Sequence, residues 1–244
     1  MLIQGGHNIC GIPIGVLCLE SYFPKPPGHI KCPSSFRFPI AYKVIKGVTV
    51  AKLLREPSDK QMVQFIAAAR ELESEGVRAI TGSCGFLALY QQELAEAVNI
   101  PVFASSLLQV PLVHRMLKSN QKVGVLTAHK SSLTPAHLKA VGVEEHMVCI
   151  AGMEGQPEFT EVILEGKRYS MDLDKVESEV VEVAAAFAHA HPEVGALVLE
   201  CTDMPPFANH IQQKTGLPVF DLSTLTNMVG EVVNRQPYHG ILQR

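Results

Sequence analysis

The 244-residue sequence contains no tryptophan, only 6% aromatic residues and no cluster of basic residues. Lysine and arginine together number 21, and aspartate and glutamate number 24, which gives a formal net charge of −3. Without a basic cluster, the chain lacks the electrostatic footprint that binding to nucleic acid or to an anionic membrane requires. Hydrophobic residues make up 47% of the sequence, which is enough to bury one or two cores. We therefore expect a globular protein with neither a nucleic-acid nor a membrane partner.

The sequence also lacks an uninterrupted apolar run of membrane-spanning length. Segment 1–19 is uncharged, but it has no cationic start and is broken by polar residues, glycines and a proline. Segment 97–114 is interrupted in the same way. We therefore predict neither a signal peptide nor a membrane span, and we expect a cytoplasmic protein. In that compartment the six cysteines are expected to be reduced thiols.

Short β-branched runs alternate with helical stretches, which is typical of an α/β fold with parallel sheets covered by helices on both faces. A helix is predicted after Ser58, which forms a capping pair with Gln61, and it should end at Gly76. A second helix is predicted over residues 172–191. The predicted strands are residues 14–19, 43–49, 77–81, 102–105, 123–127, 147–151, 196–200 and 219–221.

A proline-rich segment runs from Tyr22 to Pro39 and contains five prolines. Such a density of proline excludes regular structure. We predict a long loop, and because long loops in compact domains often cover a ligand, this segment is a candidate lid.

An internal repeat is the most informative feature of the sequence. Residues 77–113 align without a gap to residues 194–230, so that Cys84 is equivalent to Cys201. Two similar halves, residues 1–114 and 115–244, are therefore expected to face each other, and the C-terminal helix is a candidate for crossing back to the first half.

Each half places an apolar strand directly before its cysteine and a helical stretch after it. A helix amino terminus favours a thiolate, and parallel sheets bind ligands at the carboxyl ends of their strands. Two thiols on opposite sides of a cleft can remove a proton from a carbon next to a carboxylate and return one to the opposite face. Gly85 allows a close approach to the ligand, and Thr202 offers a hydroxyl. This chemistry needs no cofactor and no metal, and we expect a small carboxylate as substrate.

Three motifs resemble the cofactor-independent aspartate/glutamate racemase superfamily: Gly82-Ser83-Cys84-Gly85, Glu200-Cys201-Thr202, and the loop Pro27–Phe36 after the first strand. The likeness covers essentially the whole chain. It implies two pseudo-symmetric α/β domains with the active site between them, and a racemase or epimerase that acts on a small carboxylate such as an amino acid. Its implied catalysts are Cys84 and Cys201. The predicted substrate-binding residues are Glu20, Ser83, Gly85, Thr127, Thr202 and Asp203.

The chain departs from the amino-acid racemases of this superfamily beside both cysteines. Those enzymes carry Asn-Thr after the first cysteine and a histidine two residues after the second, whereas Gly85-Phe86 and Asp203 stand here. Phe86 favours a less polar pocket. Hydantoin racemase, maleate cis-trans isomerase and arylmalonate decarboxylase chemistry therefore stay open as alternatives.

Three further classes of protein are alternatives to this interpretation. A cysteine hydrolase would use Cys84 as nucleophile, and a non-catalytic protein would only bind a small carboxylate. A dinucleotide-dependent dehydrogenase fails, because no G-x-G-x-x-G follows the first strand. His7, Cys10, His29 and Cys32 are ligand types that zinc prefers, but they lack a tight knuckle and we expect no metal there. The oligomeric state is left open, with a homodimer as one option.

Overall fold

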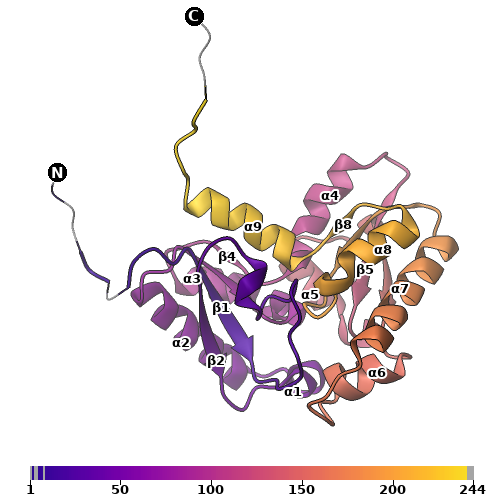
Figure 1. The fold of residues 1–244 in the computed structure, drawn as a ribbon, viewed down its shortest axis with the longest axis horizontal. Coiled ribbons are helices and arrows are strands. Elements are labelled where there is room, and N and C mark those ends of the chain that lie inside the picture. The colour runs from indigo at the N-terminus through magenta and orange to yellow at the C-terminus, as the bar shows by residue number, and fades with distance from the viewer. Residues whose placement is uncertain (1, 3–4, 8, 241–244) are drawn as a thin grey trace, which may run out of the picture.

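The computed structural model describes residues 2, 5–7 and 9–240, and it contains two four-stranded parallel sheets flanked by helices (Figure 1). The strand orders are β2-β1-β3-β4 and β6-β5-β7-β8, so the second sheet repeats the topology of the first. The predicted α/β class is confirmed. The strands are β1 (Ile14–Leu19), β2 (Ile40–Ile45), β3 (Ala79–Gly82), β4 (Val102–Phe103), β5 (Lys122–Thr127), β6 (Val148–Gly152), β7 (Val194–Leu199) and β8 (Val219–Phe220).

The helices cover both faces of the sheets, and short 3-10 and π segments connect several of them. None of the helices in the described residues combines the length and the hydropathy of a membrane-spanning helix. The α-helices are α1 (Val50–Arg55), α2 (Asp59–Ser74), α3 (Gln91–Ala97), α4 (Val110–Met116), α5 (Pro135–Ala140), α6 (Pro157–Phe159), α7 (Leu173–Ala190), α8 (Ala208–Thr215) and α9 (Leu222–Val233).

The two long helices form where the sequence predicts them. Ser58 and Gln61 make the expected capping box at the start of α2, and Phe65 and Leu72 on its apolar face are buried. One strand prediction is wrong in position: β2 ends at Ile45 rather than running to residue 49. The chain turns at Gly47, whose φ of 78° lies in the left-handed region that glycine tolerates.

The repeat places the two cysteines at equivalent ends of the two sheets. Strand β3 ends at Gly82 and strand β7 ends at Leu199, two residues before Cys84 and Cys201 respectively. The central strands β1 and β5 are almost entirely buried, as expected for strands covered by helices on both faces.

The last helix, α9, packs against the first sheet although it follows the second one in sequence (Figure 1). Leu222 and Leu225 of α9 share a buried apolar cluster with Ile14 and Val16 of β1. Burying such aliphatic side chains stabilises this contact by roughly 1.5–3 kcal/mol each. The chain therefore returns to the first sheet after it completes the second.

The segment from Tyr22 to Pro39 forms the predicted loop, with one short 3-10 helix over Pro33–Ser35. Its middle rests on the second half of the chain. Gly28 has a φ of 101°, and a Cβ added there would lie 2.8 Å from the Cα of Pro206. The hydroxyl of Ser223 also donates a hydrogen bond to the carbonyl oxygen of Gly28. The loop thus bridges the two halves above the carboxyl ends of the strands.

Candidate active site

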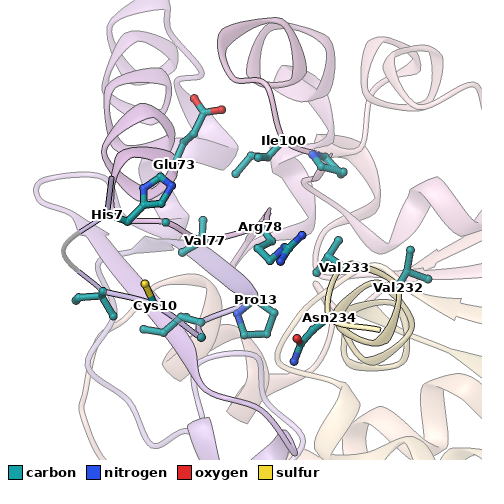
Figure 2. Close-up of a pocket in the computed structure, with 15 residues that line it drawn as sticks. His7, Cys10, Pro13, Glu73, Val77, Arg78, Ile100, Val232, Val233 and Asn234 are labelled. Carbon is teal, nitrogen blue, oxygen red and sulfur yellow. The ribbon is translucent and has the colours of Figure 1, made fainter. Parts of the chain in front are cut away.

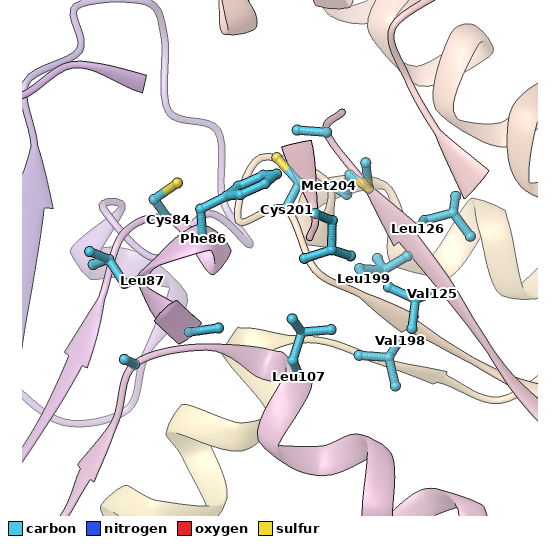
Figure 3. Packing of buried hydrophobic residues seen from close by; sticks show 14 of the residues in the cluster. Cys84, Phe86, Leu87, Leu107, Val125, Leu126, Val198, Leu199, Cys201 and Met204 are labelled. Atoms are coloured by element: carbon cyan, nitrogen blue, oxygen red, sulfur yellow. The ribbon is translucent and has the colours of Figure 1, made fainter. Parts of the chain in front are cut away.

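Cys84 and Cys201 line one small chamber at the carboxyl ends of the two sheets. Both side chains are buried, and in the view of Figure 3 the ring of Phe86 lies between them. The free space is about 10 Å³, which is far too small for an organic substrate. The chamber is lined by Val50, Ser83, Cys84, Gly85, Phe86, Ala128, Ile163, Glu200, Cys201, Thr202 and Asp203.

The sequence predicts a helix amino terminus that favours a thiolate at each cysteine, but in this closed chamber burial has the opposite effect. Burial raises the pKa of Cys84 and of Cys201 far above the ordinary range, and the neighbouring carboxyl groups of Glu200 and Asp203 raise it further. No α-helix begins at either residue, since Cys84 precedes a 3-10 helix and a turn separates Cys201 from the helical segment that begins at Pro205. Neither thiol therefore has an α-helix dipole that could offset the rise in its pKa caused by burial.

Asp203 connects Cys201 to a histidine of the proline-rich loop. The thiol of Cys201 donates a hydrogen bond to Oδ2 of Asp203 at 3.6 Å, and Nε2 of His29 donates to Oδ1 at 2.8 Å. The backbone N–H of Lys31 donates to Nδ1 of His29, which assigns the ring proton to Nε2 and makes the imidazole neutral. Burial lowers the pKa of His29, in agreement with a neutral ring. The result is a Cys201–Asp203–His29 chain.

Asp203 stays ionised although little of its side chain is exposed. Burial alone would raise the pKa of its carboxyl, but His29, Lys25 and Lys31 together hold that pKa below its ordinary value. Lys31 donates to the carbonyl oxygen of Leu19, and its own pKa is lowered by burial. Lys25 lies over the ring of Phe23 at 3.3 Å from the centroid, and burial lowers its pKa to about 8. The loop therefore brings two half-buried cations close enough to lower the pKa of Asp203.

Glu200 immediately precedes Cys201 in the sequence and is completely buried. Its Oε2 accepts hydrogen bonds from the hydroxyl of Thr127 at 2.8 Å and from the N–H of Ala128 at 3.5 Å. Its Oε1 has no hydrogen-bond partner among the residues that the structure describes. Burial raises the pKa of Glu200 to about 7, so near neutral pH a large fraction of this carboxyl is protonated.

The hydroxyl groups predicted to bind substrate are engaged within the protein. Thr127 donates to Glu200, and Thr202 donates to the carbonyl oxygen of Ser83 at 2.8 Å, joining the two halves. The Ser83 hydroxyl accepts from the N–H of Leu19 at 2.9 Å. Ser83 and Thr202 line the chamber, whereas Thr127 supports it through Glu200. Substrate contacts by these residues stay a prediction.

Glu20 lies outside the chamber, in an adjoining cavity of about 290 Å³. Val50 and Ile163 line both spaces and form the wall between them. Gly85 lines the chamber and packs against Glu200, and its close approach to a ligand stays a prediction. The sequence alone indicates no role for His29 other than that of a zinc-type ligand, and none for Glu200 or the two lysines. The loop motif and the Glu-Cys-Thr motif contained three of these four residues, and Lys25 lies just ahead of the loop motif.

A larger cavity of about 700 Å³ lies at the opposite, amino-terminal edge of the first sheet (Figure 2). Pro13, Arg78 and Pro101 line it just before strands β1, β3 and β4. It contains neither Cys84 nor Cys201, and ligands of parallel sheets bind at the other edge. We therefore place the candidate active site at the two cysteines.

One group of potential metal ligands occurs within the described part of the chain, and it is not the quartet at which the sequence gives no expectation of a metal. Cys149 and His191 each lie 3.2 Å from Oε1 of Glu193. Of the four residues weighed for zinc, His29 is bound to Asp203. None of the three described residues Cys149, His191 and Glu193 belongs to the lining of the chamber.

Solved structures with this fold include racemases and a decarboxylase. An aspartate racemase homologue from Pyrococcus horikoshii superposes with a TM-score of 0.57 at 17% identity, covering 91% of this chain and 99% of that one. Arylmalonate decarboxylase superposes with a TM-score of 0.60 at 12% identity, covering 91% and 93% of the two chains. The predicted racemase-type fold is confirmed.

Curated relatives are more similar in sequence. Dimethylsulfoniopropionate lyase of Durusdinium sp. clade D is 32% identical over 221 residues, which span 88% of this chain and 72% of that protein. Dimethylsulfoniopropionate lyase 7 of Emiliania huxleyi is 32% identical over 244 residues, which span 96% and 71%. No protein-family model matches the chain. On this similarity, the chain belongs to the family of the dimethylsulfoniopropionate lyases, and it has the fold of the aspartate and glutamate racemases.

Proposed function

We propose that this protein is a lyase that cleaves dimethylsulfoniopropionate, or a closely similar β-sulfonium carboxylate. The names of its relatives support a lyase rather than the amino-acid racemase that the sequence motifs imply. One observation within the site carries the proposal: the thiol of Cys201 contacts the ionised carboxylate of Asp203, which buried His29 holds in place. A base of this kind can remove a proton next to a carboxylate.

The reaction needs one proton transfer and one bond cleavage. A base removes a proton from the carbon next to the carboxylate, and the released electron pair forms the double bond to the neighbouring carbon. The bond from that carbon to the sulfonium sulfur breaks, and sulfur keeps its electron pair. The products are neutral dimethyl sulfide, acrylate and the protonated base, so atoms and charge balance without an oxidant or a reductant.

Cys201 is the proposed base, and Asp203 is its proton acceptor. Among the described residues, Cys201 is the member of the cysteine pair whose thiol donates to a carboxylate. Transfer of the thiol proton to Asp203 leaves a thiolate that faces the substrate. His29 acts as a positioning residue, because it fixes the Asp203 carboxylate through the 2.8 Å hydrogen bond.

The charges around the chamber suit a zwitterionic substrate with a cationic end. Two carboxyl groups, Glu200 and Asp203, raise the pKa of the thiols, so an approaching sulfonium would lower it again. Lys25 and Lys31 can attract the carboxylate end. A dicarboxylic amino acid carries an ammonium group but a net charge of −1, so it would offset the two protein carboxyl groups less than a net-neutral sulfonium carboxylate does. The charges therefore favour a sulfonium carboxylate.

The test is to incubate the purified protein with dimethylsulfoniopropionate in heavy water. Dimethyl sulfide is measured by gas chromatography, while acrylate and the α-hydrogen signal are measured by proton NMR. We expect both products from the unmodified protein, none from Cys201→Ala and a measurable rate from Cys84→Ala, because an elimination needs a single base. Absence of dimethyl sulfide with the unmodified protein overturns the proposal.

A racemase or epimerase is the second candidate, and the presence of two cysteines in one chamber favours it. Proton transfer on both faces of a carbon needs both thiols. This reading predicts α-hydrogen exchange without dimethyl sulfide, on a panel of amino acids and hydantoins. It also predicts that Cys84→Ala and Cys201→Ala each abolish racemisation, which separates it from the lyase.

A further inference from the structure

The cavity beside the cysteine chamber has the composition of a cation-binding site. It holds about 290 Å³ and shares Val50 and Ile163 with the chamber. We name it the vestibule and define it by the side chains of Glu20, Tyr22 and Tyr169. The mechanism proposed above uses none of these three residues.

Two tyrosine rings meet at the vestibule, one from each half of the protein. Tyr22 follows strand β1, and Tyr169 lies between the π-helix Thr160–Leu164 and helix α7. Their centroids are 5.7 Å apart and their planes are tilted by 56°, so the two ring faces do not stack against each other. Ring faces carry negative electrostatic potential and attract sulfonium and quaternary ammonium groups. Both side chains are largely exposed, which leaves these faces accessible.

A carboxylate completes the vestibule. Oε1 of Glu20 accepts a hydrogen bond from the Tyr22 hydroxyl at 2.5 Å, and Oε2 accepts from the N–H of Gly47 at 2.8 Å. These bonds lower the pKa of Glu20, which keeps it ionised at neutral pH. The charges of Lys46 and Lys52 also lower this pKa, but within the described residues neither lysine forms an ion pair with Glu20.

The other charged side chains of the vestibule are already neutralised. The guanidinium of Arg168 bonds to Glu158 at 2.6 Å and lies 3.6 Å from Glu161. Glu165 is paired with Lys167 at 2.6 Å. Among the described charged side chains that line the vestibule, the carboxylate of Glu20 is therefore the one available to pair with a cationic ligand.

We propose that the vestibule binds the onium group of the substrate before the substrate passes between Val50 and Ile163 to the cysteines. The ligand class is small sulfonium or quaternary ammonium compounds, and this inference rests on the proposed function. A zwitterion would be oriented by the charges along this path. Phe23 lines the vestibule, and the ammonium group of Lys25 lies above its ring. Lys25 also interacts electrostatically with Asp203 of the chamber, so its positive charge lies on the inner side of the vestibule and attracts the carboxylate end of the substrate inwards.

The wall between the two spaces is built from one residue of each half. Val50 is the first residue of helix α1, and Ile163 belongs to the π-helix against which α1 packs. π-Helical turns occur frequently at functional sites, where their irregular hydrogen bonding permits rearrangement. The chamber is closed, so a substrate in the vestibule can reach the thiols directly only when these two side chains move apart.

Binding is tested with tetramethylammonium chloride as the probe, by saturation-transfer NMR, because this ion cannot react. We expect transfer to its methyl protons with the unmodified protein, and affinity lower by about fivefold in Tyr169→Leu and in Glu20→Gln. Tyr169→Phe keeps the ring and should restore binding. Tyr238→Leu, a change at an exposed tyrosine near the C-terminus, is the matched control. Sodium propionate, which lacks the cation, should show no dependence on Tyr169.

Turnover provides the second measurement. We expect Tyr169→Leu to raise KM for dimethylsulfoniopropionate by about fivefold and to change kcat much less, since the ring acts before the chemical step. Equal tetramethylammonium binding by Tyr169→Leu and the unmodified protein would overturn the vestibule, even if dimethyl sulfide is produced. Tyrosine-dependent binding without any dimethyl sulfide would instead overturn only the proposed lyase function.

Discussion

The carboxyl group of Glu200 lies directly against the backbone of Gly85. A Cβ added to Gly85 would stand 2.2 Å from both the main-chain oxygen and Oε1 of Glu200. Because these two residues sit next to Cys201 and Cys84 respectively, the contact also sets how the two halves of the chamber meet. The absence of a side chain at Gly85 is therefore a packing requirement between the halves.

Gly85→Ala is expected to destabilise the protein by about 1–3 kcal/mol, because the new methyl group collides with a main-chain oxygen that cannot rotate away. Urea unfolding followed by circular dichroism measures the change. Gly155→Ala is the control, since a Cβ there meets nothing within 4 Å. Equal unfolding midpoints for the two variants would show that the halves can separate enough to accept the methyl group.

Glu200→Gln should change how stability depends on pH. The folded-state pKa of about 7 lies above the ordinary value of 4.5, so the stability linked to this group is full below about pH 4.5 and is lost as the pH rises to about 7. Relative to Glu200→Gln, the unmodified protein should lose roughly 3 kcal/mol over that interval. The free energy of unfolding at pH 5 and at pH 8 gives the comparison.

Glu93→Gln, a change at an exposed carboxylate, controls for the loss of one negative charge. It should follow the unmodified protein at both pH values. If the difference between the unmodified protein and Glu200→Gln is the same at pH 5 and pH 8, the Glu200 carboxyl does not titrate in this interval, and its burial between the cysteines would need another explanation.

The sequence predicts the sheets and the cysteine pair because both depend on local pattern. The gapless repeat makes Cys84 and Cys201 equivalent, and parallel strands bring equivalent ends to one edge. The partner of Asp203 is 174 residues away in His29, and no local pattern encodes such a contact. The predicted lowering of the thiol pKa by a helix amino terminus is outweighed for the same reason, since burial of Cys201 is a property of the assembled halves. Glu20 was predicted near the cleft, and it lies one cavity further out.

His29→Gln tests whether the loop histidine positions Asp203. Loss of the histidine should raise the pKa of Asp203, because His29 is among the groups that hold it low. Activity requires ionised Asp203, so the acidic limb of the rate profile should move to higher pH, and kcat should fall by at least tenfold. The profile of kcat against pH, measured through dimethyl sulfide release, reports both effects.

His146→Gln is the control for that experiment, because His146 is exposed and its contacts, with Glu144 and the ring of His114, lie away from the chamber lining. Its profile should coincide with that of the unmodified protein. A purely structural role for His29 would lower stability and kcat without moving the acidic limb, and that outcome would contradict the positioning role.

Thiol labelling tests the closed chamber directly. In native protein at pH 7.5, iodoacetamide should modify exposed Cys10 and half-buried Cys32 first, and should leave Cys84 and Cys201 largely unmodified. The two chamber thiols are protonated and buried, and alkylation needs an accessible thiolate. Peptide mass spectrometry measures the six rates, and a sample in concentrated urea shows that each thiol can react. Rapid labelling of Cys201 at the rate of Cys10 would mean that the halves open often without substrate. The barrier to substrate entering the chamber would then lie elsewhere than at Val50 and Ile163.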